Sequence, residues 1–193
     1  MFHKGLNRDG IVEAAKKLIE ENGFGAFSMR VLAEKLGVKT ASLYAHIESM
    51  DALFTEVGLS ALNDQKAAQL AAIEGKSGDA AIFALAESYR VFAKAHAALY
   101  QLIMQMPMGK DKTLREAAAM TAEPSMQILR DYSIPEERRM HWQRVLRGVM
   151  HGFVSQEASG YFSHYPVDLG ESYRLAIGCV VDGLHREVAR NER

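Results

Sequence analysis

Residues 27–47 read FSMRVLAEKLGVKTASLYAHI, and this pattern predicts two helices joined by a tight turn. Ser28 is a favourable N-cap because its hydroxyl can accept a hydrogen bond from a free backbone N–H of the first helical turn. Gly37 stands where a left-handed residue commonly ends a helix, and Thr40 can cap the shorter helix that follows. A helix, a glycine-containing turn and a short second helix are typical of a helix-turn-helix, whose second helix enters the DNA major groove.

The second helix of this segment is predicted to have one buried side and several polar positions. Leu43 and Ile47 point inward at i and i+4, which leaves Ser42, Tyr44 and His46 on the other faces. An ordinary hairpin of two helices with a polar surface would have the same pattern. Local geometry therefore leaves both DNA binding and a plain hairpin open.

The chain before this segment predicts one more helix, over residues 7–23. Asn7 is a favourable N-cap, Asp9 lies where a negative charge suits the helix dipole, and Gly23 can end the helix. Its buried stripe consists of Ile11, Ala14, Ala15, Leu18 and Ile19. Packed against residues 27–47, this helix would complete a three-helix core.

The rest of the chain predicts further helices and no sheet. Hydrophobic residues make up 48% of the chain and charged residues 24%, and its four prolines leave long segments rich in helix-forming residues. Helices are expected over residues 49–73, from Asp79 onward, and over residues 97–107, 112–132, 135–161 and 168–191. Pro124 should kink or divide the helix that contains it.

The predicted fold is therefore all-α and has two domains. Residues 1–48 would form a three-helix helix-turn-helix DNA-binding domain. Residues 49–193 would form a larger helical ligand-binding and dimerisation domain. At 193 residues the chain is long enough to bury a sizeable core in such an arrangement.

Charge and cysteine content limit the possible functions. The formal net charge of −1 excludes a large basic surface, but residues 1–47 contain seven Lys or Arg and five Asp or Glu, which permits a local DNA footprint. The single cysteine, Cys179, cannot form an intramolecular disulfide and is expected to be a small buried apolar residue. No signal sequence or membrane-spanning run appears, so we expect a soluble, cytoplasmic protein with no membrane partner.

The last two predicted helices, over residues 135–161 and 168–191, are apolar over more than one face. Gly148 and Gly152 on the first, and Gly178 and Gly183 on the second, would allow neighbouring helices to approach closely. We predict that two copies of the chain join through these helices in a four-helix homodimer interface. Burial of the same faces inside one monomer is the alternative.

The sequence LGV at residues 36–38, followed by SLYAHI at residues 42–47, strongly resembles the TetR family of bacterial transcriptional repressors. The match extends over about residues 7–57, whereas the remainder of the chain resembles the family only in the number and length of its helices. The resemblance implies a dimeric, all-helical repressor that binds a palindromic double-stranded DNA operator. A small-molecule effector in the C-terminal domain would change the separation of the two recognition helices and release the operator.

The same resemblance implies which residues contact DNA. The matching positions are Ser28, Arg30, Lys39, Thr40, Ala41, Ser42, Tyr44 and His46. Thr40 and Ala41 would read bases, and Arg30 would reach a base edge or a phosphate. The hydroxyl and imidazole groups of the set would hold the phosphate backbone, which orients the protein without specifying sequence. For Tyr44, partial burial as a core aromatic is the alternative.

Three residues depart from the pattern of the family. Lys39 replaces a frequent Ser or other cap and adds positive charge near the groove, and Ala41 replaces a frequent Gly or Pro. Met50 stands where a lysine often meets a phosphate, and Glu48 nearby would oppose an anion. These departures move the expected phosphate grip from the start of the fourth helix towards the recognition helix.

The C-terminal part of the chain offers candidates for a ligand cavity. They are Tyr89, Phe92, His96, Tyr100, Met104, Met120, His141, Trp142 and His151, with Met106, Met108 and Met126 as further members. Adaptable methionines with a few aromatic and histidine side chains suit a small, largely apolar effector. Ordinary core packing is the alternative for each of them.

Motifs of catalysis and of metal or cofactor binding are missing from the sequence. It contains no glycine-rich phosphate loop, no nucleophile elbow and no paired-cysteine metal site, so we predict a protein that is not an enzyme and uses no cofactor or metal. The competing hypothesis is a helical small-molecule-binding protein without DNA-binding activity.

Overall fold

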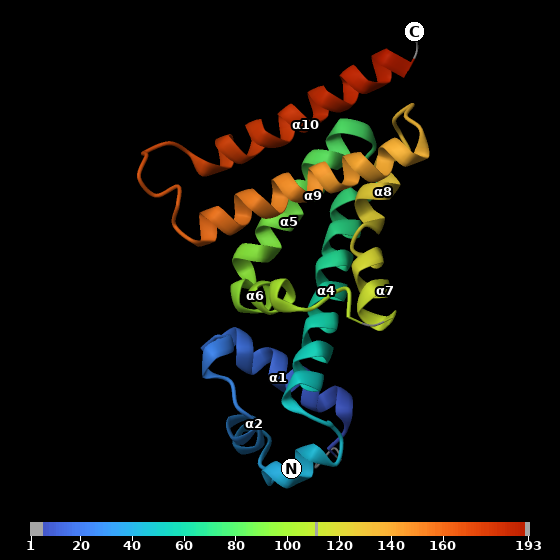
Figure 1. The fold of residues 1–193 in the computed structure, drawn as a ribbon. Coiled ribbons are helices and arrows are strands. Elements are labelled where there is room, and N and C mark those ends of the chain that lie inside the picture. Colours follow the sequence, from blue (N-terminus) through green and yellow to red (C-terminus); the bar gives the residue numbers. More distant parts are fainter. Residues whose placement is uncertain (1–5, 111, 192–193) are drawn as a thin grey trace. The chain divides into compact units, whose positions relative to one another are not determined.

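The computed structural model describes residues 6–110 and 112–191, and its regular structure over these residues is entirely helical (Figure 1). The predicted all-α class is confirmed. The first helices are α1 (Arg8–Asn22), the 3-10 turn η1 (Phe24–Ala26), α2 (Met29–Leu36), α3 (Thr40–Tyr44) and α4 (Met50–Ile73). The others are α5 (Gly78–Ala95), α6 (Ala97–Gln105), α7 (Lys112–Met120), α8 (Glu123–Leu129), α9 (Glu136–Ala158) and α10 (Leu169–Asn191).

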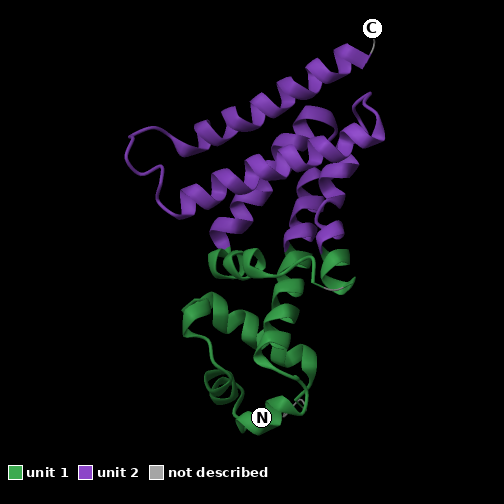
Figure 2. Cartoon of the chain, in the orientation of Figure 1, with its two compact units in different colours: residues 1–64, 96–117 green, residues 65–95, 118–193 purple. Residues whose placement is uncertain are grey.

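The helices divide between two compact units (Figure 2). Unit 1 consists of residues 1–64 and 96–117, and unit 2 consists of residues 65–95 and 118–193. The helix α4 therefore contributes its first part to unit 1 and its last part to unit 2. The predicted boundary between residues 48 and 49 does not coincide with this division. It stays a prediction about function, with residues 1–48 as the DNA-binding domain.

Local capping explains where several helices begin. The side chain of Asn7 accepts from the backbone N–H of Gly10 at 2.8 Å, and that of Ser28 accepts from Val31 at 3.2 Å. Ser49 caps α4 in the same way, with 3.0 Å between its hydroxyl oxygen and the backbone nitrogen of Ala52. Because each cap satisfies a donor that the helix leaves free, the start of each helix is set by short-range sequence.

The turn between α2 and α3 has the predicted glycine but a different cap. Gly37 has φ 67° and lies in the left-handed region, where a residue without a Cβ is favoured. The prediction that Thr40 caps α3 is wrong, because the extended backbone of Lys39 (φ −77°, ψ 144°) takes the N-cap position. Thr40 is instead the first residue of the helix. The side chain of Lys39 makes no capping bond.

In unit 1, α1 packs against α2 and α6 around a fully buried apolar core. Ile11, Ile19, Leu32, Leu43 and Ile47 supply its interior, each exposing 1% of its surface or less. Ion pairs between α1 and α4 lie at the edge of this core. Arg8 donates from Nε to Glu56 at 2.7 Å, and Lys16 pairs with Asp64.

In unit 2, α9 and α10 lie side by side, and α5 packs against both of them and against α8 (Figure 1). The fully buried Tyr173 of α10 donates its hydroxyl hydrogen to the carbonyl of Ala86 in α5 at 2.8 Å. Arg90 forms a two-point ion pair with Glu157, with both N–O distances at 2.8 Å, and its guanidinium lies 5.5 Å from the centre of the Tyr173 ring. These polar contacts connect α5 to both late helices.

Two further expectations have clear outcomes in unit 2. The helix expected over residues 112–132 is divided as predicted, since α7 ends at Met120 and Pro124 lies in the first turn of α8, where proline needs no N–H partner. Cys179 was expected to be buried, and it is exposed on α10 because it lies on the side that faces away from the core. Within the described ranges, no helix is both long and apolar enough to cross a membrane.

Candidate DNA-binding surface and ligand cavity

The short helix α3 is fixed to the core of unit 1 by one buried residue within it and one just beyond its end. Leu43 is fully buried, and its carbonyl accepts from the backbone N–H groups of both His46 and Ile47 at 2.9 Å. Ile47, just beyond the helix, is 1% exposed. These two anchors hold the inner side of α3 and determine which residues face outward.

The outward side of α3 carries most of the residues predicted to contact DNA. Ala41, Ser42, Tyr44 and His46 are exposed, and Thr40 is half-buried. Tyr44 has 51% of its surface exposed, so its ring does not fill the small core as the alternative interpretation required. The structure thus brings these residues together on one surface. It does not test their contacts with DNA, which stay predictions.

The two predicted contact residues on or beside α2 are placed differently from each other. Arg30 is exposed and lies 3.5 Å from Glu34, one turn later in the same helix. Ser28 is half-buried, and its oxygen already accepts the capping bond from Val31. Its hydroxyl hydrogen is the group that remains for a phosphate, since a hydroxyl has one donor in addition to its lone pairs.

The positive charge near α3 is concentrated in a few side chains. Lys16 and Lys35 pair with carboxylates, which neutralise them locally. Lys39, exposed directly before α3, makes no ion pair with any residue of the described part of the chain. Met50, at the start of α4, is 41% exposed and offers no charge to a phosphate. Lys39 therefore offers unpaired positive charge directly before α3, and the expected shift of the phosphate grip towards this helix stays a prediction.

The residues predicted to bind a ligand do not gather at one place. Five members of the set belong to unit 1, namely His96, Tyr100, Met104, Met106 and Met108, whereas the rest belong to unit 2. His96 pairs with Glu20 of α1, and Trp142 of α9 packs against α10 so closely that a Cβ on Gly183 would lie 2.6 Å from the indole ring. Of the predicted set, Tyr89 lines the cavity described next. The ligand-binding role of these residues stays a prediction.

Unit 2 contains a small internal cavity with a largely polar lining. Its walls are formed by Gln65, Gln69, Leu85, Tyr89, Thr121, Ser125, Gln143, Arg147 and Met150. Among the described residues, the buried polar side chains number four, namely Gln65, Gln69, Ser125 and Gln143, and every one of them lines this cavity. The space has room for one water molecule at most.

The polar groups of this cavity are only partly paired. Arg147 donates from Nη1 to the Thr121 hydroxyl at 2.7 Å, and the Ser125 hydroxyl donates to the Ala122 carbonyl at 2.8 Å. The Nε2 atom of Gln65 is buried and has no hydrogen-bond partner within residues 6–110 and 112–191. Nearby on α9, burial and the charge of Arg147 lower the pKa of His151, so this imidazole is neutral at pH 7.

Sequence reasoning missed this cavity, although a signal for it was present. The buried row of α4 runs at four-residue steps through Val57 and Ala61 to Gln65 and Gln69, and ends at Ile73. Helical periodicity assigns the positions of these two glutamines to the buried face, where apolar residues are expected. Polar residues at such positions often mark functional sites. The search for aromatic, methionine and histidine residues passed over them.

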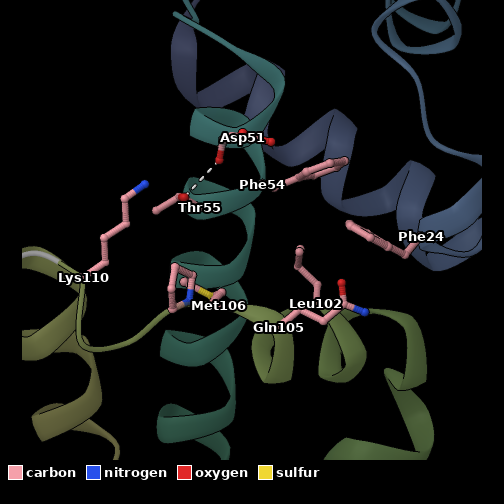
Figure 3. Close-up of a pocket in the computed structure, with 9 residues that line it drawn as sticks. Phe24, Asp51, Phe54, Thr55, Leu102, Gln105, Met106 and Lys110 are labelled. Atoms are coloured by element: carbon pink, nitrogen blue, oxygen red, sulfur yellow. Dashed lines mark hydrogen bonds between the residues drawn. The ribbon is translucent and has the colours of Figure 1, made fainter.

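Unit 1 has a separate surface cleft at the start of α4 (Figure 3). The rings of Phe24 and Phe54 meet there with centroids 4.7 Å apart, and Lys110 lies on the opposite side from Phe24 (Figure 3). The Thr55 hydroxyl of this cleft donates to the backbone carbonyl of Asp51 at 2.9 Å. The cleft is open to solvent, and it contains none of the buried polar side chains described above.

Comparison with known proteins adds evidence that is independent of this geometry. Residues 11–57 match the family model of bacterial regulatory proteins of the tetR family. Residues 82–180, about half of the chain, match the model of the tetracyclin repressor-like C-terminal domain. The chain belongs to the TetR family. It is a DNA-binding transcriptional regulator with an N-terminal helix-turn-helix, and the family consists of regulators rather than enzymes.

The similarity to individual proteins extends over most of the chain. An uncharacterized HTH-type transcriptional regulator of Mycobacterium tuberculosis is 29% identical over 164 residues, which cover 84% of this chain and 75% of that protein. A protein of unknown function from Rhodococcus sp. RHA1 has the same fold, with a TM-score of 0.78, 24% identity and coverage of 94% and 97%. The Streptomyces coelicolor protein ActR in complex with actinorhodin has a TM-score of 0.71, 20% identity and coverage of 95% and 99%.

Proposed function

We propose that the protein is a cytoplasmic repressor that binds a palindromic DNA operator as a homodimer and is released by a small molecule. The observation that carries this proposal is the exposed polar side of α3, held in place by the buried Leu43 and Ile47. A short helix anchored in this way presents side chains that can enter the major groove. Because its target would be chromosomal DNA, the protein would act in the cytoplasm.

The contacts with DNA would be divided between base reading and phosphate binding. Thr40 and Ala41 would meet base edges from the start of α3, with Arg30 at the edge of the groove. Ser42, Tyr44 and His46 would hold phosphates, and the exposed Lys39 would add the charge that Met50 cannot supply. Ser28 would contribute its hydroxyl hydrogen as one more phosphate donor.

The homodimer would form through α9 and α10. Val145 on α9 and Leu175 on α10 expose 46% and 70% of their surfaces, which places apolar surface on both helices. Gly148 and Gly178 lie on the same two helices, and no other described atom would be near a Cβ at either position. A twofold axis through such an interface would pair two recognition helices, and a palindromic operator matches this symmetry.

The helical part of the chain, residues 49–193, would bind the effector. ActR, which has a similar fold, was crystallised with actinorhodin. The internal cavity of unit 2 is the corresponding candidate in this chain, because it combines an enclosed space with several convergent polar groups. Binding there would change the fraction of protein in the DNA-binding conformation.

A band-shift titration against the promoter region next to the gene of this protein tests the proposal. We expect tight binding to one palindromic site, a dimer-to-site ratio of one, and affinity that falls steeply with salt because several phosphates are contacted. Sedimentation of the free protein should give a dimer, and Leu175→Asp should convert it to a monomer. Equally weak binding to all sequences would contradict the repressor and favour a ligand-binding protein without DNA activity.

A further inference from the structure

The polar lining of the cavity in unit 2 indicates the chemistry of the molecule that would bind there. The inference below rests on the proposed function, since it concerns the effector of the same regulator. Buried polar side chains are costly when they lack partners, so proteins rarely place them in a core without a reason. Here all four buried polar side chains of the described residues surround one space.

If these side chains had a purely structural role, each of their polar atoms should have a hydrogen-bond partner within the protein. Gln65 contradicts this, because the residue is only 5% exposed and its Nε2 atom has no partner in the described chain. Gln65 and Gln69 come from α4, and Gln143 comes from α9, so the amides converge from two helices that are far apart in sequence. An amide kept unpaired in this way is available to a molecule that is not part of the chain.

The charge of the cavity indicates the kind of molecule. Arg147 is the one charged side chain in the lining, and no Asp or Glu of the described chain lines the space with it. One of its nitrogens holds Thr121, and a guanidinium has five N–H donors in a planar fork. Such a fork matches a carboxylate at two points. His151 on the same helix is neutral because burial lowers its pKa, so it adds no competing charge.

We propose that the effector is a small hydrogen-bonding carboxylate. Its carboxylate binds Arg147, and its other polar atoms bind the amides of Gln65, Gln69 and Gln143. A largely apolar effector fits this cavity less well, because it would leave the buried Nε2 of Gln65 without a partner. The methyl and ring groups of Leu85, Tyr89 and Met150 contact its carbon skeleton.

The size of the cavity makes binding a conformational event. The space holds one water molecule at most, so a carboxylate enters only when the lining parts of α4, α8 and α9 move apart. A ligand that binds one conformation better than another shifts the population by that difference in affinity. The contacts with Arg147 and the three glutamines supply this difference, because they form only in the opened cavity.

The test compares matched probes on the full-length protein by calorimetry and thermal unfolding. The probes are 3-hydroxybutyrate, 4-hydroxybenzoate, their primary amides and toluene. We expect at least one of the two carboxylates to bind and to raise Tm, with its amide binding about tenfold more weakly. In Arg147→Gln the affinity for the carboxylate should fall about ten- to hundredfold. The matched control is Arg144→Gln, an exposed arginine of the same helix, which should bind as the wild type does.

Each opposite result overturns the inference. Binding of neither carboxylate, tighter binding of toluene, or equal binding by Arg147→Gln and wild type would each exclude a carboxylate held by Arg147. DNA binding by the wild type without any probe, measured by band shift, tests the proposed function separately. Specific DNA binding without carboxylate binding would exclude the carboxylate effector and support the proposed DNA-binding function. Carboxylate binding without DNA binding would support the carboxylate site and contradict the proposed DNA-binding function.

Discussion

The recognition helix α3 and the cavity of unit 2 use polar side chains in opposite ways. On α3 the polar residues are exposed and held in place by buried neighbours, as Tyr44 is by Leu43. In the cavity the polar residues are themselves buried, as Gln65 and Gln143 are. Exposed polar groups keep their hydration and cost the fold little, whereas buried ones reduce stability unless they find partners.

Because of this difference, we expect substitutions in the two regions to affect different properties of the protein. A substitution on the outer side of α3 should change affinity for DNA and leave the free energy of unfolding nearly unchanged. A substitution of a buried polar group in unit 2 should change the free energy of unfolding as well.

The partly buried ion pair of unit 2 should respond most strongly. Arg90 and Glu157 expose 12% and 10% of their side chains, and Glu157→Gln would leave the guanidinium without its charged partner. We expect the free energy of unfolding to fall by about 3 kcal/mol, measured by urea denaturation. The control is Glu34→Gln, which breaks the exposed pair with Arg30 and should cost about 0.5 kcal/mol or less. An equal loss of stability in Glu157→Gln and Glu34→Gln would contradict the contrast between the two regions.

The same pair should make unit 2 sensitive to acid. The hydrogen bond from Arg90 lowers the pKa of Glu157 below its ordinary value of 4.5 and outweighs burial, which raises it. The stabilisation is therefore complete above the ordinary pKa and is lost as the pH falls through the lowered pKa of the folded state. Urea denaturation between pH 7 and pH 3 should show a smaller loss of stability in Glu157→Gln than in the wild type. An identical pH dependence would remove Glu157 from the acid response.

Arg30 should affect sequence preference without affecting the fold. In Arg30→Ala we expect discrimination at particular operator base pairs to fall by about 1–2 kcal/mol, because an arginine that reads a base edge is lost. Band shifts with single base-pair changes in the operator would measure this, and Tm should stay nearly unchanged. A uniform loss of affinity over all sequences would instead indicate a phosphate contact.

Gln65 should show the cost of an unpaired buried amide. Gln65→Met keeps the length of the side chain and removes the unpartnered Nε2, so the free energy of unfolding should rise by about 1 kcal/mol. The matched control is Gln127→Met on α8, where the side chain is exposed and the change should be about 0.5 kcal/mol or less. Destabilisation by Gln65→Met would mean that the amide supports the fold.

Tyr44 should show the smallest effect, confined to DNA binding. Tyr44→Phe removes one hydroxyl from an exposed ring, so affinity should fall about three- to tenfold for all sequences alike, with no change in Tm. Tyr161→Phe, at another exposed tyrosine, is the control and should leave DNA affinity unchanged. Unaltered affinity in Tyr44→Phe would exclude a phosphate contact by its hydroxyl.

The sequence by itself determined the helices and the outer side of α3, because both depend on residues close together in the chain. The caps at Asn7 and Ser28 and the left-handed Gly37 follow from short-range hydrogen bonding and backbone sterics. The four-residue spacing of Leu43 and Ile47 sets which side chains of α3 face outward. Local rules failed at Thr40 and at Cys179, where a neighbour's backbone and the orientation of α10 decided the outcome.

Only the tertiary structure decided the character of the cavity. Gln65, Ser125 and Gln143 are separated by many residues, and although Gln65 interrupts an apolar stripe of α4, nothing in the sequence connects it with the other two. Packing of α4, α8 and α9 buries them around one space together with Arg147. Burial depends on which helices pack on a face, and helical periodicity within one segment does not contain this information. For this reason the sequence pointed to aromatic, methionine and histidine candidates, whose ligand-binding role stays a prediction, and did not indicate this polar cavity.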